Sequence, residues 1–131
     1  MDNPLQQLYT ALLLKLNRTY PNMVYDGWMP PADTPYPFIF LGDVYDSADL
    51  SKKLNLFGRA TVTVHVWHND FRKRGDLSTM MLKIRMMARN IETDGYGWCL
   101  TDCEERYVKD TSTKDALLHG VLSISYKYWR K

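Results

Sequence analysis

His65 and His68 form the motif H-x-x-H, and they are two of the three histidines in the chain. Imidazole nitrogens are common zinc ligands, and zinc needs them within about 2.1 Å. The surrounding segment, ATVTVHVWHND at residues 60–70, is rich in β-branched residues, which favour a strand over a helix. Side chains three positions apart on a strand point to opposite faces. The two histidines therefore cannot share a metal ion, and we expect them to be structural.

Two carboxylates further along the chain have a spacing that could support acid–base chemistry. Asp102 and Glu104 share one face of a predicted strand and could act as a proton donor and acceptor. Arg106 continues the same face, so the three side chains are better explained as a solvated row of charges. We expect no catalytic role for this row.

The remaining candidates are isolated side chains or incomplete motifs. The run RKR at residues 72–74, close to Phe71 and Trp67, could meet phosphate, but charges in a turn are usually solvated. His119 precedes Gly120 at the start of the last predicted strand; it could cap or donate within a turn, and a lone histidine is more often structural. There is no G-x-S-x-G elbow and no phosphate-binding loop. We expect no enzyme, no metal and no cofactor.

Length and composition indicate one globular domain, residues 1–131, with an ordinary balance of 45% apolar and 24% charged residues. The net charge of +2 is too small to single out nucleic acid or a membrane as partner. Cys99 and Cys103 lie too far apart on an extended segment for a disulfide, so we expect free thiols and a reducing compartment. The apolar run at residues 11–14 is too short for a signal sequence or a membrane span.

Hydrophobic periodicity predicts an α+β fold. Asn3 can cap a helix over residues 4–17, and a second helix is expected from about Asp76, with a core stripe that reaches Ile91. The turn DGYG at residues 94–97 follows it. Strands are expected within residues 23–28, 38–45, 60–70, 98–109 and 121–129. The simplest packing is one mixed or antiparallel sheet with both helices on one face, and a long connection at residues 46–59 between central strands.

Three apolar side chains point away from the predicted core. Leu82 and Met86 lie one turn apart on the far side of the second helix, and Leu14 does the same on the first. Isolated exposed apolar residues are common and need no explanation. The alternative is that these residues form patches that contact a second subunit.

Several segments, in this order and spacing, resemble the tail-completion proteins of long-tailed bacteriophages, also called tail terminators or tail-to-head joining proteins. The resemblance covers nearly the whole chain. It is carried by LYTALLLKL (residues 8–16), VYDG (24–27), PYPFIFLGD (35–43), VTVHVWHND (62–70) and HGVLSISYKY (119–128).

The resemblance implies a structural virion protein that forms a ring, expected to be a hexamer, and has no active site. The ring would cap the tail tube, stop its elongation and join the tail to the head connector or stopper protein, with DNA only passing through its lumen. It would be made in the host cytoplasm and reside at the head–tail interface of the virion, and its subunits could be monomers in solution. The interaction residues expected on this basis are Asp49, Lys52, Lys53, Leu56, Phe57, Leu14, Leu82 and Met86.

Two other functions remain open at this stage. A neck or head-completion protein of the same virion would share the ring but bind a different neighbour. A small hydrolase or metalloenzyme of similar fold could use His65 or Asp102. A nucleic-acid module ranks lower, because strong salt-dependent binding needs more clustered basic charge than this chain carries.

Overall fold

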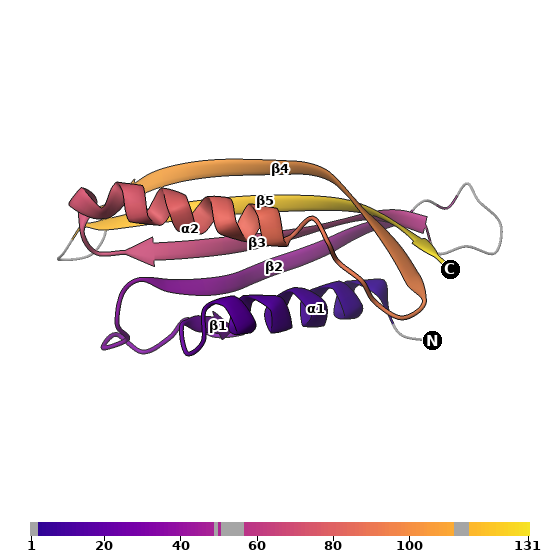
Figure 1. Ribbon diagram of the computed structural model, residues 1–131, viewed down its shortest axis with the longest axis horizontal. Helices are drawn as coiled ribbons and strands as arrows, with labels where there is room; N and C mark the ends of the chain where they lie inside the picture. The colour runs from indigo at the N-terminus through magenta and orange to yellow at the C-terminus, as the bar shows by residue number, and fades with distance from the viewer. Residues whose placement is uncertain (1–2, 49, 51–56, 112–115) are drawn as a thin grey trace.

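The computed structural model describes residues 3–48, 50, 57–111 and 116–131. Five strands form one open mixed sheet in the order β1-β2-β3-β5-β4 (Figure 1). Among the described strands, β1 and β2 pair in parallel and the other three pairs are antiparallel. The α+β class and the single mixed sheet are therefore confirmed. The strands are β1 (Val24–Asp26), β2 (Phe38–Ala48), β3 (Phe57–His68), β4 (Tyr96–Asp110) and β5 (Leu117–Arg130).

The first helix, α1 (Pro4–Thr19), begins where its sequence predicts and ends two residues later than expected. The side chain of Asn3 caps it by accepting a hydrogen bond from the backbone N–H of Leu5, at 2.9 Å. Leu8, Leu12 and Leu16 are fully buried, as the leucine stripe predicts.

The second helix, α2 (Arg74–Met87), starts two residues before the predicted Asp76 and follows a short 3-10 helix, η1 (Phe71–Lys73). Its core stripe is confirmed by the buried Leu77, Met81 and Ile84. The predicted helix runs too far, because α2 ends at Met87. Ile91, beyond that end, is nevertheless buried.

One hydrophobic core joins both helices to the sheet. Its sheet layer is made by cross-strand rows such as Leu41, Val64 and Leu122, which lie opposite one another on β2, β3 and β5. Figure 1 shows α2 running along β3 and β5 and α1 running beside β2. Lys15 of α1 links the helices by donating to the backbone carbonyls of Met87 and Asn90.

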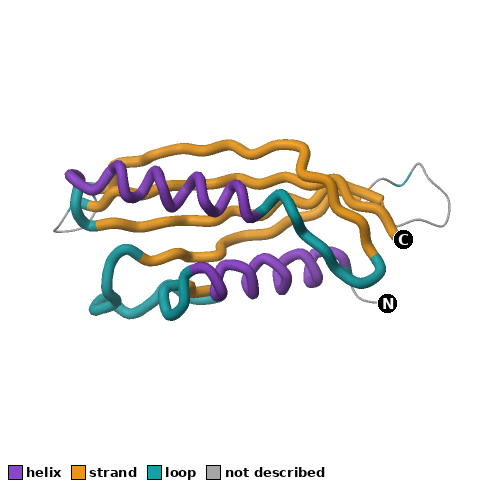
Figure 2. Tube along the Cα trace, in the orientation of Figure 1, coloured by secondary structure: helices purple, strands orange, loops and turns teal. Residues whose placement is uncertain are grey.

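The predicted connection at residues 46–59 is shorter than expected. β2 extends to Ala48 and β3 begins at Phe57, so both ends of that segment belong to a hairpin (Figure 2). The sequence predicts a loop there because polar residues interrupt the apolar pattern. In the structure, the backbone pairing of β2 and β3 continues beyond the residues that contact the core. Within the predicted connection, residues 49 and 51–56 lie outside the described residues.

The last two strands are also longer than predicted. β4 begins at Tyr96, so the second half of the expected DGYG turn is already strand, and β5 begins at Leu117. A register shift in β4 between Leu100 and Asp102 changes which residues face the core. Leu100 and Cys103 therefore both pack on the core although they are three positions apart. No helix in the described part of the chain is long and apolar enough to cross a bilayer.

Candidate interaction surface

The buried residues of both helices pack against one side of the sheet, together with the buried valines of β3. We call the other side of the sheet the open face. Because side chains alternate along a strand, the residues between the buried valines of β3 and the buried residues of β5 must point to this face. Thr61 and Ser125 form a hydrogen bond of 2.9 Å across its middle. On β2, β3 and β5 the open face includes Phe40, Tyr45, Phe57, Arg59, Thr61, Thr63, His65, Trp67, His119, Val121, Ser123, Ser125, Lys127 and Trp129, and β4 adds Cys99, Asp102, Glu104 and Arg106 opposite β5.

A histidine pair lies at one end of the open face. His65 Nδ1 and His119 Nε2 are 2.7 Å apart, and the Trp67 ring stacks on His119 with ring centres 3.6 Å apart. The expectation that His119 is a lone histidine in a turn is wrong, because β5 starts earlier and places His119 opposite Trp67. His68 faces the core side and is 9% exposed, so the prediction that His65 and His68 point to opposite faces is confirmed.

Burial favours the neutral form of both rings. Burial, and then the neighbouring His65, lower the pKa of His119 to about 4, against opposition from Asp110. Burial lowers the pKa of His65 as well, and Asp43 opposes that shift. Gly42 allows the close approach of β2, because a Cβ there would lie 2.9 Å from His65 Nε2. The pair and its tryptophan can hold β3 and β5 together.

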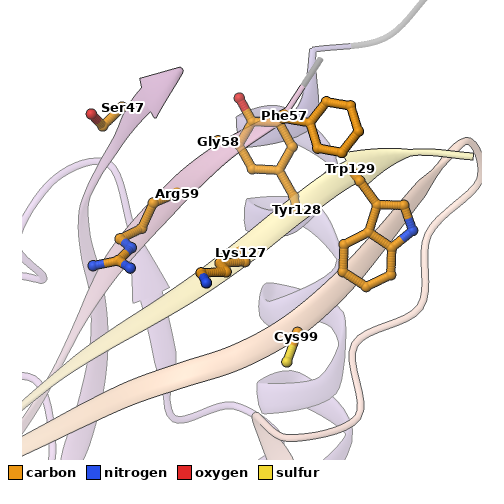
Figure 3. Close-up of a pocket in the computed structure, with 8 residues that line it drawn as sticks. All are labelled: Ser47, Phe57, Gly58, Arg59, Cys99, Lys127, Tyr128 and Trp129. Carbon is orange, nitrogen blue, oxygen red and sulfur yellow. The ribbon is translucent and has the colours of Figure 1, made fainter. Parts of the chain in front are cut away.

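A cationic groove lies at the other end of the open face. Arg59 and Lys127 are directly opposite each other on β3 and β5, and Cys99 of β4 continues the row (Figure 3). Phe57 and Trp129 form an aromatic side of the groove, which has a volume of about 570 Å³. The cationic groove is lined by Ser47, Phe57, Gly58, Arg59, Cys99, Lys127, Tyr128 and Trp129.

The two cations of this groove form no ion pair or hydrogen bond with another described side chain. Trp129 is fixed over β4, because a Cβ on Gly97 would overlap its indole ring. Tyr128 turns its hydroxyl to the core side, where it donates to the Asp46 carboxylate at 2.7 Å. The groove can therefore accept an anionic group beside an apolar one.

A second groove runs along α1 and has the opposite charge. It has a volume of about 780 Å³ and lies between the outer face of α1 and the turn before β4. Glu92 and Asp94 are its charged residues, and Leu14 is its most prominent apolar one, with 55% of its surface exposed. We call it the acidic shelf. It is lined by Asn3, Gln6, Gln7, Thr10, Ala11, Leu14, Glu92, Thr93 and Asp94.

Comparison with solved structures finds the same fold in a virion chain and in a bacteriophage protein. A chain from the virion of a native gene transfer agent particle aligns over 99% of this chain and 100% of its own length, with a TM-score of 0.60 and 16% identity. The gp17 protein of bacteriophage SPP1 aligns over 92% of this chain and 88% of its own, with a TM-score of 0.57 and 20% identity. This chain shares its fold with these two proteins. No family model and no curated protein matches the sequence.

The predicted interaction residues do not form one surface. Phe57 lines the cationic groove and Leu14 lines the acidic shelf, on opposite sides of the sheet. Leu82 and Met86 are 45% and 62% exposed on the outer face of α2. The other four, Asp49, Lys52, Lys53 and Leu56, lie outside the described residues. Sequence reasoning missed Arg59, Lys127, Glu92 and Asp94; only the alternation of β3 and β5 could have placed the first two together.

The side chains that the sequence offered for catalysis or metal binding either contact other protein groups or are exposed to solvent. Asp102, Glu104 and Arg106 form an exposed row on β4, as predicted. The RKR run lies in η1 and the first residue of α2, not in a turn, and Arg72 pairs with Asp70 at 3.4 Å. Cys99 and Cys103 are free thiols, as predicted. Within the described residues, no three His, Cys, Asp or Glu side chains are arranged to hold a metal ion.

Proposed function

We propose that this chain is a structural virion protein of a long-tailed phage or a phage-like particle. Copies of it form a ring, expected to be hexameric, that caps the tail tube and ends its elongation. The opposite side of the ring then joins the tail to the head connector, with DNA passing through the lumen. The protein acts through the surfaces it presents to its neighbours and has no catalytic role.

The observation that carries this proposal is the agreement of fold with virion proteins over almost the entire chain. The alignment with the gene transfer agent chain covers 99% of this chain and 100% of that one. The sequence resemblance to tail-completion proteins supports the finer assignment to the tail end, since it spans both the first helix and the last strand.

Ring formation and capping can be linked without any chemical step. If one side of the ring matches the end of the tube, its binding occupies the surface on which the next tube ring would grow. A subunit that closes its contacts only on this template would remain a monomer in free solution. Leu14 on α1 and Leu82 and Met86 on α2 are 45–62% exposed in the subunit. Their burial against neighbouring subunits would favour assembly.

Co-sedimentation with isolated virion parts tests this assignment. Tails and filled heads from a phage lacking the protein are incubated separately with purified protein and pelleted. We expect saturable binding to tails, at about one ring per tail, and none to heads. Binding to heads alone would replace the proposal by a neck or head-completion role, and binding to neither would refute a place at the head–tail junction.

A further inference from the structure

We propose that the cationic groove of one copy binds the acidic shelf of the next copy, so that the ring is built from one repeated head-to-tail contact. This inference rests on the proposed ring and names the surfaces that close it. Arg59 and Lys127 on one subunit would face Glu92 and Asp94 on its neighbour. Phe57 and Trp129 would cover the exposed Leu14.

The cationic groove is incomplete in the isolated subunit. Arg59 and Lys127 occupy directly opposite positions on antiparallel strands, where like charges destabilise a sheet. They have no acidic partner among the described residues. Phe57 and Trp129 remain more than a third exposed beside them. A partner with carboxylates and an apolar side chain would remove the repulsion and cover the aromatic rings.

The acidic shelf offers this combination. The carboxylates of Glu92 and Asp94 form no ion pair with a described cation, although Lys131 lies close by and donates to the Thr93 carbonyl at 3.4 Å. Lys15 and Arg18 line an adjoining pocket with Glu92, but Lys15 donates to backbone carbonyls and neither cation forms an ion pair with a described carboxylate. Leu14 lies on α1 beside the two acids. The charge and apolar content of the shelf are therefore complementary to those of the groove.

The positions of the two surfaces favour a contact that propagates. Gly97 pairs with Trp129, and the Lys131 N–H donates to the Gly95 carbonyl at 2.8 Å, so the shelf turn and the groove share one end of the sheet. The groove opens on the open face, whereas α1 packs on the core side. The sheet separates them, so they cannot pair within one chain. Contact between different surfaces of successive copies makes a ring when the rotation closes.

Cysteine cross-linking provides the direct test, because Cys99 already supplies an exposed thiol in the groove. Thr10 is exposed on the shelf and carries no charge, so T10C adds a second thiol and leaves both carboxylates intact. In a C103A background, a short bis-maleimide should convert rings formed on tail tubes into a ladder of covalent multimers up to the ring size. The matched control D33C, in the exposed loop between β1 and β2, and the variant T10C with C99S should give no ladder.

Charge exchange tests the same contact without cross-linking. R59E/K127E and E92K/D94K are each expected to reduce ring formation at least tenfold, while the chain carrying all four substitutions regains most of it. Circular dichroism must show that each variant is folded. A fourfold variant that assembles no better than the weaker double variant would overturn the proposal.

The outcomes separate this contact from the proposed function. Rings on tube ends without a T10C ladder would refute the contact and leave capping intact. A ladder in concentrated protein that never binds tubes would support the contact and refute capping. If R59E/K127E assembles normally but loses affinity for a single-stranded oligonucleotide, the groove is a nucleic-acid site and the proposal is wrong.

Discussion

Replacing Ile84 with alanine is expected to lower the free energy of unfolding by about 2–5 kcal/mol. Ile84 lies on α2, is completely buried and belongs to the cluster that joins both helices to the sheet. Truncation removes apolar contact and leaves a cavity that the surrounding side chains fill only in part. Urea unfolding followed by circular dichroism measures this loss as a lower midpoint with an unchanged slope.

Leu82 supplies the matched control on the same helix. Its side chain is 45% exposed, so L82A should change the free energy of unfolding by about 0.5 kcal/mol or less. If Leu82 contacts a neighbouring subunit, L82A will still weaken ring formation on tail tubes. A destabilisation by L82A as large as that by I84A would contradict the orientation of α2.

Acidification from pH 7 to pH 4 is expected to destabilise the folded subunit through the histidine pair. His119 has a folded-state pKa of about 4, below its ordinary value, so its neutral form is favoured by folding. The corresponding stability is fully present above about pH 6.5 and is lost as the pH falls towards 4. Because the ring is only half-buried, we expect His119 to contribute about 1–2 kcal/mol to this loss.

The variant H119Q isolates that contribution. Glutamine can still meet His65 but carries no ionisable ring, so the fall in unfolding free energy between pH 7 and pH 4 should be shallower in H119Q. Urea unfolding at several pH values gives the two slopes, and NMR titration of the His119 ring gives its pKa directly. Equal slopes in the two proteins, or a His119 pKa near 6.5, would contradict the neutral, hydrogen-bonded pair.

The elements of the fold were predictable where side chains repeat with a clear period. Leu8, Leu12 and Leu16 mark one buried helix face, and Val62, Val64 and Val66 mark one buried strand face. The predicted ends of strands were wrong where backbone pairing continues without an apolar pattern. β2 and β3 extend into the segment predicted as a connection, because strand hydrogen bonds do not require apolar side chains.

The candidate surfaces were less predictable because they depend on register between distant strands. His65 and His119 are 54 positions apart, and nothing local indicates that β3 and β5 bring their rings together. The same register places Arg59 opposite Lys127. Phe57 and Leu14 were found as exposed apolar residues, but only the structure separates them into two grooves of opposite charge.

Electron microscopy of tube ends tests the central claim most directly. Tails assembled without this protein are mixed with the purified chain and with excess tube subunits, and tube lengths and ends are recorded. We predict that elongation stops and that each stopped end carries an additional ring of density. Tubes that continue to grow at the same rate, with no density at their ends, would contradict the proposed function.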